Sequence, residues 1–292
     1  MYEINRTHAR WAFKDLLGQA NHFLITILVG LNGVRDGLIE KDEEFSTSWN
    51  PQSVERSADR SRAFVLDLAL VRAIDALDTY MMMSARKPRA ISDINFGKRM
   101  DGTGRSVSKR LAVFEEFTSA LPQHHKAALE VSIGWRNKRV HSLAQDKIDS
   151  KTLKLLSNNA NHFKQGYSGL DIEDFLKRFT SGASPTFKDA AAVIRMTHEA
   201  VEHYDSFLLQ NLDVEMYLKE SLLAFMKTEN ANPGKVIRKT WDSEKKEEKV
   251  LRLLRMIGVN KTESVRGRRV PDQFVYSLVD LKYEEVLEFL ED

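Results

Sequence analysis

An all-α fold is predicted by three features of the sequence. Proline occurs only six times in 292 residues. Few segments alternate strictly between apolar and polar residues, as a half-buried strand would. Long segments instead repeat apolar residues at the three- and four-residue spacing of an amphipathic helix. We therefore expect a helical protein, with at most a short strand in the stretch 267–281 (GRRVPDQFVYSLVDL).

The expected helices follow one another along most of the chain. They cover residues 5–39, 54–86, 107–119, 122–143, 150–163, 172–179 and, with a break, 186–227. A polar stretch separates the first two, and residues 87–105 are rich in turn formers, so a long loop is expected there. The stretch 228–234 (TENANPG) resembles a linker. We therefore predict a helical domain at 1–226 and a small C-terminal module at 227–292.

Composition restricts the kinds of site that the chain can hold. Cysteine is absent, which excludes disulfide frameworks, thiolate metal sites and cysteine nucleophiles. The most apolar run, residues 23–31, is far shorter than the roughly 20 residues of a membrane-spanning helix. The N-terminal sequence has no apolar core of a secretory signal. We therefore expect a cytoplasmic protein that needs neither a membrane nor a cofactor.

One short stretch, GWRNKRVHS at 134–142, places unusual residues on an amphipathic helix. At about 100° per residue, Arg136 falls in the middle of an apolar stripe formed by Leu129, Ile133, Val140 and Leu143. Burying a guanidinium is unfavourable by several kcal/mol unless it is paired and hydrogen-bonded. A partner for Arg136 is therefore expected elsewhere in the fold.

The second helix offers two acidic partners. Asp75 and Asp78 lie on one face of the segment 63–83, which is apolar almost all round. We expect one of them to pair with Arg136 or to orient a polar group beside it. The alternative is a purely structural buried ion pair. An ion pair alone does not explain the neighbouring Asn137 and His141, which are four residues apart and are expected on one flank of the stripe.

The segment from Arg136 to His141 has the form R-N-x3-H. It resembles the R-x(4–6)-H signature of the HEPN superfamily (higher eukaryotes and prokaryotes nucleotide-binding). The setting is also similar, with two long helices, a shorter pair, and the signature on the fourth helix. The resemblance covers about residues 1–145, or extends to 226 if the long later helix is the fifth of the bundle, and it implies an antiparallel helical bundle.

The HEPN resemblance implies a metal-independent endoribonuclease, of the kind found in toxin–antitoxin, abortive-infection and anti-phage defence systems. By this resemblance Arg136 would hold the scissile phosphate, His141 would transfer protons and Asn137 would position one of them. Lys138 and Arg139 are expected to point outward, where they would contact RNA. The implied partners are RNA, of which tRNA is one candidate, a second copy of the chain and an antitoxin or regulatory protein. The alternative is an inactive HEPN-like module that binds nucleotides or proteins.

A second histidine pattern, THEAVEHYD at 197–205, comes near the helical zinc-protease motif H-E-x-x-H. His203 comes one residue too late, however, which turns it about 100° away from the face of His198. An ordinary amphipathic helix is the better interpretation, and no metal site is predicted.

The C-terminal module carries an excess of positive charge. Residues 235–269 contain twelve basic and five acidic side chains, a net charge of +7, and an acidic end follows at 280–292. A basic strip of this kind could follow an RNA backbone. It could equally be a solvated helix with internal ion pairs, covered by the acidic tail. The sequence does not decide between these two interpretations.

Overall fold

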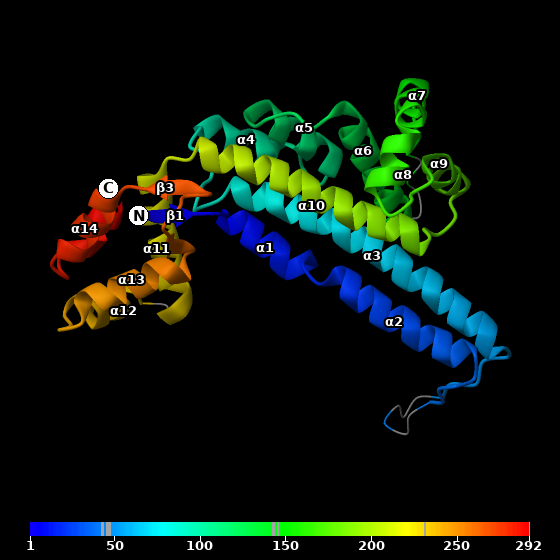
Figure 1. The fold of residues 1–292 in the computed structure, drawn as a ribbon, viewed down its shortest axis with the longest axis horizontal. Coiled ribbons are helices and arrows are strands. Elements are labelled where there is room, and N and C mark those ends of the chain that lie inside the picture. The colour runs from blue at the N-terminus through cyan, green and yellow to red at the C-terminus, as the bar shows by residue number, and fades with distance from the viewer. Residues whose placement is uncertain (42–43, 45–47, 142–143, 145, 231, 292) are drawn as a thin grey trace. The chain divides into compact units, whose positions relative to one another are not determined.

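The computed structural model describes residues 1–41, 44, 48–141, 144, 146–230 and 232–291. Helices account for most of these residues, and the only strands among them are three short ones, so the all-α prediction is confirmed (Figure 1). The sequence-based expectations differ from the structure mainly at helix ends and in one loop.

The expected first helix at 5–39 is in fact two helices, and a short strand precedes them. The elements are β1 (Tyr2–Ile4), α1 (His8–Leu17) and α2 (Ala20–Arg35). At Gly18, the N–H donates to the carbonyl of Lys14 at 2.7 Å. A Cβ at Gly18 would lie 2.5 Å from that same oxygen, closer than any side chain tolerates. The helical pattern of the sequence continues through Gly18, but the helix itself is interrupted there.

Helix α3 (Val54–Ser84) matches the second expected helix, whereas the expected loop at 87–105 contains a helix, α4 (Ile94–Gly102). The side chain of Asp93 caps α4 by accepting from the N–H of Asn95 at 2.8 Å. Phe96 and Met100, one turn apart, are buried. The turn formers therefore flank a short capped helix rather than fill a loop. Helix α5 (Val107–Phe117) follows, with Ser106 as its cap.

The remaining helices of the main segment largely follow the expected order. They are α6 (Gln123–Val140), α7 (Ser150–Asn158), α8 (Ala160–Gly166), α9 (Ile172–Ser181), α10 (Phe187–Gln210) and α11 (Val214–Asn230). The break expected in 186–227 lies between α10 and α11. The short strand expected in 267–281 is β3 (Arg268–Val270).

The chain divides into two compact units. Unit 1 contains Met1–Ala12, Asp78–Ala120 and Val201–Asp292, and unit 2 contains Phe13–Leu77 and Leu121–Ala200. Both units are therefore built from segments that are far apart in the sequence. The expected boundary at 227 between a helical domain and a C-terminal module stays a prediction.

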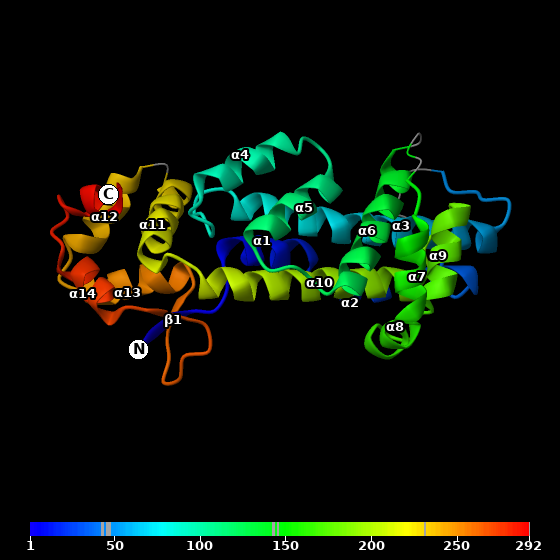
Figure 2. The ribbon, with the colours of Figure 1, turned by 90° about the horizontal axis from the view of Figure 1, so that it is seen from above.

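Unit 2 is held together by apolar contacts between α2, α3, α6, α9 and α10. Leu24 and Leu28 of α2 pack with Leu66 of α3 and with Ala190 of α10. A second cluster surrounds Trp135 of α6, which has no exposed surface and meets the rings of Phe175 and Phe179 of α9 edge-on. Figure 2 shows α6, α7 and α9 gathered in one part of this unit. This packing fixes the helix that carries the R-N-x3-H segment.

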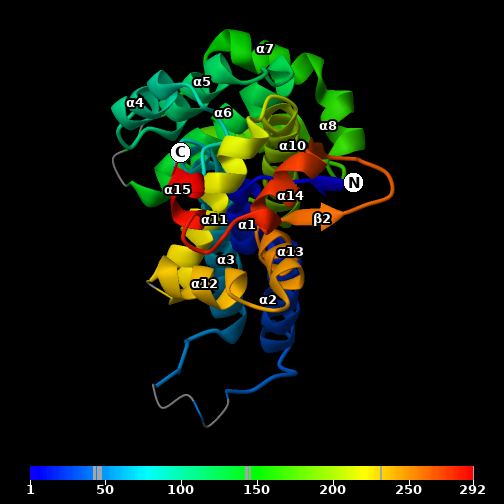
Figure 3. The same cartoon turned by 90° about the vertical axis from the view of Figure 1, so that its left-hand side faces the viewer.

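Unit 1 combines an aromatic core with the small sheet. Tyr80, Phe114 and Tyr204 pack ring against ring, with centroids 5.8 and 5.1 Å apart. Strand β1 lies between β2 (Val259–Lys261) and β3 and is antiparallel to both; Figure 3 shows β2 beside the N-terminus. Four helices complete the unit: α12 (Pro233–Trp241), α13 (Lys246–Met256), α14 (Asp272–Asp280) and α15 (Val286–Glu291).

Helix α2 leaves much of its apolar surface uncovered. Phe23 is 60% and Val29 64% exposed. The stretch 8–35 is long and apolar enough to span a membrane by length and composition, and only 17% of its most apolar window is buried. This is weak evidence for a membrane span, because the stretch consists of two helices and α2 has only 16 residues, fewer than the roughly 20 required.

Candidate functional site

The apolar stripe of α6 runs from the core of unit 2 to its surface. Leu129 and Ile133 are buried, the side chain of Arg136 is 17% exposed, and Val140 is 45% exposed. Leu143, the last expected member of the stripe, lies outside the described residues. Arg136 therefore sits at the point where the stripe leaves the core, close enough to water for a ligand to reach its guanidinium.

Asp75 of α3 is the partner of Arg136. The Nε and Nη2 atoms of Arg136 donate to the same carboxylate oxygen, Oδ1, at 3.0 and 2.7 Å. The Asp75 side chain is 44% exposed, so the pair lies at the surface end of the α3–α6 contact. Two hydrogen bonds to one oxygen fix the plane of the guanidinium and hold its N–H donors in one orientation.

Asp78, the other expected partner, forms an ion pair with Arg110 instead. Arg110 also donates to the carbonyl of Gly104 at 2.6 Å and belongs, like Asp78, to unit 1. The structure thus gives Asp78 a contact that ties α3 to α5 and to the turn before it. It does not bring Asp78 to the R-N-x3-H segment.

Asn137 lies beside the Arg136 guanidinium. Its Oδ1 accepts from Nη1 of Arg136 at 3.4 Å, and its Nδ2 donates to Asp146 at 3.4 Å. Asp146 was not singled out from the sequence. The one sequence feature that points to this contact is Gly134, because a glycine inside a helix often has a packing reason. A Cβ at Gly134 would lie 3.1 Å from the Cβ of Asp146.

His141 is not part of the helix, contrary to the expectation that the helix reaches 143. Helix α6 ends at Val140, and His141 has an extended backbone with φ −121° and ψ 108°. Its N–H still donates to the carbonyl of Asn137 at 2.8 Å, which keeps it one turn away from that residue. The shared flank expected for Asn137 and His141 stays a prediction. The exposed imidazole follows the surface end of the helix.

Lys138 and Arg139 do not both point outward as expected. Arg139 lies against α3, with Nε 3.0 Å from Oδ1 of Asp67 and Nη2 donating to the carbonyl of Gly182 at 2.9 Å. The Nε and Oδ1 atoms form an ion pair without hydrogen-bond alignment. Burial raises the pKa of Asp67, and the charge of Arg139 partly offsets this rise. Arg139 thus attaches α6 to α3.

The ammonium of Lys138 lies 3.9 Å from the centre of the Phe179 ring and donates to the carbonyl of Phe179 at 3.3 Å. Lys138 and Arg139 border a hollow of about 660 Å³, together with Lys147 and Asp146. Among the described residues, three cations and one carboxylate line this hollow. Their net positive charge suits an anionic ligand. A role of Lys138 and Arg139 in binding RNA stays a prediction.

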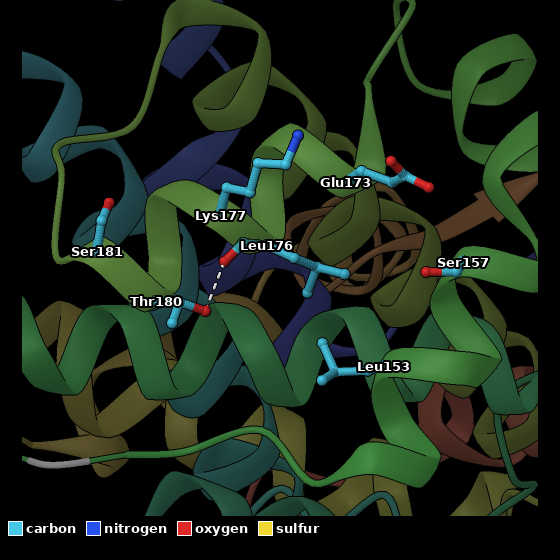
Figure 4. A pocket seen from close by; sticks show the side chains of 7 residues that line it. All are labelled: Leu153, Ser157, Glu173, Leu176, Lys177, Thr180 and Ser181. Carbon is cyan, nitrogen blue, oxygen red and sulfur yellow. Dashed lines mark hydrogen bonds between the residues drawn. The ribbon is translucent and has the colours of Figure 1, made fainter.

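A neighbouring hollow of about 430 Å³ lies between α7 and α9 (Figure 4). Its only charged lining groups among the described residues are Glu173 and Lys177. The hydroxyl of Thr180, labelled in Figure 4, donates to the carbonyl of Leu176 within its own helix at 2.8 Å. The charges balance and the polar groups do not converge, so we assign no chemistry to this hollow.

The two histidines of THEAVEHYD, His198 and His203, contact different parts of the fold. His198 meets the ring of Phe13 edge-on at 4.9 Å, whereas His203 shares a hydrogen bond of 2.9 Å with the hydroxyl of Ser119. Within the part of the chain that the structure describes, no cluster of three or more His, Asp or Glu side chains is arranged to hold a metal ion. Both histidines take part in packing.

Comparisons of the chain with protein-family models, with curated proteins and with solved structures gave no match. The resemblance to the HEPN superfamily therefore depends on the R-N-x3-H segment and on its helical setting. Any functional assignment therefore depends on the geometry around Arg136.

Proposed function

We propose that the chain is a HEPN-type, metal-independent endoribonuclease in which Arg136 binds the scissile phosphate, His141 transfers protons and Asn137 positions the guanidinium. The observation that carries the proposal is the Arg136–Asp75 pair. A guanidinium that is oriented by a carboxylate and partly open to solvent, on a helix that ends at an exposed histidine, is suited to a phosphate ligand.

The chemistry follows from RNA itself. The 2′-hydroxyl attacks the adjacent phosphorus, its proton passes to a base, and the 5′-oxygen leaves as a hydroxyl after it gains a proton. The products are a 2′,3′-cyclic phosphate and a 5′-hydroxyl. Imidazole suits both proton transfers near neutral pH, and guanidinium stabilises the charge that develops on the phosphorane. Three of the donors of Arg136 contact Asp75 and Asn137, and a guanidinium has five N–H groups, which leaves donors for the phosphate.

A homodimer is part of the proposal. Arg136 meets Asp75 while Arg139 meets Asp67, so α6 runs antiparallel to α3. Leu68 is 50% exposed, like Val140 at 45% and the nearby Phe64 at 63%. A second copy that covers this apolar patch would bring its own His141 close to the site, so that two imidazoles could share the two proton transfers.

The cellular role belongs to the same proposal. A metal-independent ribonuclease without cysteine fits the cytoplasm, where RNA substrates such as tRNA are present. Such an activity has to be restrained, which suggests a toxin or anti-phage effector with an antitoxin or other regulatory partner.

A second candidate, a non-catalytic HEPN-like nucleotide-binding or protein-interaction module, is favoured by one observation. The Arg136–Asp75 pair would also serve as a structural link between α3 and α6, since a second ion pair, Arg139–Asp67, links the same two helices.

The test is cleavage of a labelled tRNA pool and a generic single-stranded RNA in excess EDTA. Wild type is expected to give cyclic-phosphate ends, and both Arg136→Ala and His141→Ala are expected to lose cleavage by about 10²- to 10³-fold. The control, His22→Ala, removes an exposed imidazole from α2 of the same unit and should retain activity. Cleavage that survives both substitutions would rule out the proposed site, and an inactive wild type would favour the binding module.

A further inference from the structure

Unit 1 contains a second basic hollow, formed where α12 and α13 face each other. It has a volume of about 410 Å³, within the range of about 300–1,000 Å³ that is usual for ligand sites. Lys235 and Lys239 line it from α12, and Lys249 and Arg252 line it from α13. We call this hollow the α12/α13 groove. No acidic side chain of the described residues lines it.

The four cations are arranged by helical spacing. Lys235 and Lys239 are four residues apart and Lys249 and Arg252 three apart, so each helix presents two like charges on one face. Within the described part of the chain, none of the four has a carboxylate partner, and the Lys249 ammonium instead donates to the carbonyl of Lys239 at 2.9 Å. Like charges on one helix face repel each other and destabilise the helix, and a bound anion would reverse this effect.

Other basic side chains nearby are compensated. Arg238, also on α12, lies 4.0 Å from Asp242 and over the ring of Tyr283. The C-terminal segment therefore contains acids that can pair with its cations, yet the groove is lined without them. Its positive charge is a local property rather than a consequence of the net charge of the segment.

The floor of the groove is apolar and is held by the core of unit 1. Val236 and Leu253 are buried beneath it, which fixes the two helices against each other. Phe225 of α11 is half-buried and Met256 of α13 is 50% exposed. A planar group that enters between the cations would meet this apolar surface.

We propose that the α12/α13 groove binds single-stranded RNA, with phosphates on the four cations and a base against Phe225 and Met256. Grooves for single strands combine backbone cations with an apolar or aromatic surface for the bases. The cations lie on opposing walls of a hollow, which a flexible strand can enter and a flat anionic bilayer cannot. This inference goes beyond the proposed ribonuclease activity and does not depend on it, because it concerns binding at a different site.

The test measures binding of a fluorescein-labelled 2′-O-methyl oligonucleotide to the full chain by fluorescence anisotropy, in EDTA. The 2′-O-methyl groups remove the nucleophile, so the result is independent of cleavage. The variant Lys239→Gln/Arg252→Gln is expected to bind about tenfold or more weakly at 100 mM salt, and its slope of log K against log salt should fall by about 1.4, about 0.7 per lost phosphate contact.

The matched control is Lys245→Gln/Arg255→Gln. It removes two exposed cations of the same module that do not line the groove, and it should bind like wild type. Equal losses in the two variants would overturn the proposal in favour of diffuse attraction. Loss in Arg136→Ala alone would overturn it in favour of the α6 site, and binding to phosphatidylserine vesicles but not to the oligonucleotide would overturn it in favour of a membrane surface.

Discussion

Replacing Asp75 by Asn tests whether the Arg136–Asp75 pair positions a catalytic group or only joins two helices. Asn keeps the size and an acceptor oxygen but removes the charge. Hydrogen bonds to charged groups contribute about 1.5–3 kcal/mol and neutral ones about 0.5–1.5 kcal/mol. Because the guanidinium stays charged in the variant, the two bonds at 3.0 and 2.7 Å would weaken without becoming neutral, and together they would lose at most about 2 kcal/mol.

Solvent reduces this loss. The Asp75 side chain is 44% exposed, and exposed ion pairs contribute about 1 kcal/mol or less. We therefore expect Asp75→Asn to lower the free energy of unfolding by about 1 kcal/mol, measured by urea denaturation. If the pair positions Arg136, the cleavage rate at saturating RNA should fall about tenfold, equivalent to about 1.4 kcal/mol in the barrier, with a smaller change in KM. Asp75→Glu should restore part of the rate.

Asp67→Asn is the matched control, because Asp67 lies about two turns before Asp75 on α3 and its pair with Arg139 links the same two helices. Because burial raises the pKa of Asp67, loss of its charge should lower the free energy of unfolding by no more than the Asp75 change does, and the rate should stay nearly unchanged. If both variants lost activity in proportion to their loss of stability, or if Asp75→Asn cleaved RNA like wild type, the Asp75 pair would be a structural link and the positioning argument would fail.

Two further predictions concern pH and assembly. Burial alone would raise the pKa of Glu220, but hydrogen bonds from Arg89 have the larger combined effect and the pKa is lowered. The ionised Glu220 therefore stabilises the fold fully above the unfolded pKa of about 4.3. This stabilisation is lost as the pH falls through the lowered pKa. Glu220→Gln should destabilise unit 1 by about 1–3 kcal/mol at pH 7 and by much less near pH 3, and a difference in urea midpoint from wild type that did not shrink in acid would contradict this. Phe64→Ser/Leu68→Ser removes part of the exposed apolar patch on α3 and should shift sedimentation from dimer to monomer, whereas Phe23→Ser on α2 should not; an unchanged dimer would exclude this face.

Much of the candidate site could be anticipated from the sequence. A guanidinium in an apolar helical stripe needs a partner, and Asp75 and Asp78 were the two acids on one face of a nearly apolar helix. They are three residues apart, so their directions differ by only about 60°. Local spacing could not choose between them, because the choice depends on which helix lies against each turn of α3.

The end of α6 was less predictable. The apolar pattern continues beyond Val140, and no proline or glycine marks the end of the helix at His141. The helix nevertheless ends there, and the exposed histidine adopts an extended backbone. The direction of Arg139 was misjudged for a related reason. Its place on the helix pointed away from the stripe, but Asp67 and the carbonyl of Gly182 come from two other segments that approach that side.

The sequence by itself determined the helical class, the order of most helices and the need of Arg136 for a partner, because periodicity, scarce proline and the unfavourable burial of charge are local properties. Only the tertiary structure decided that Asp75 is that partner, that β1 pairs with strands more than 250 residues away, and that four cations of α12 and α13 face one groove. Each of these depends on how distant segments approach one another, which burial of apolar surface selects for the chain as a whole.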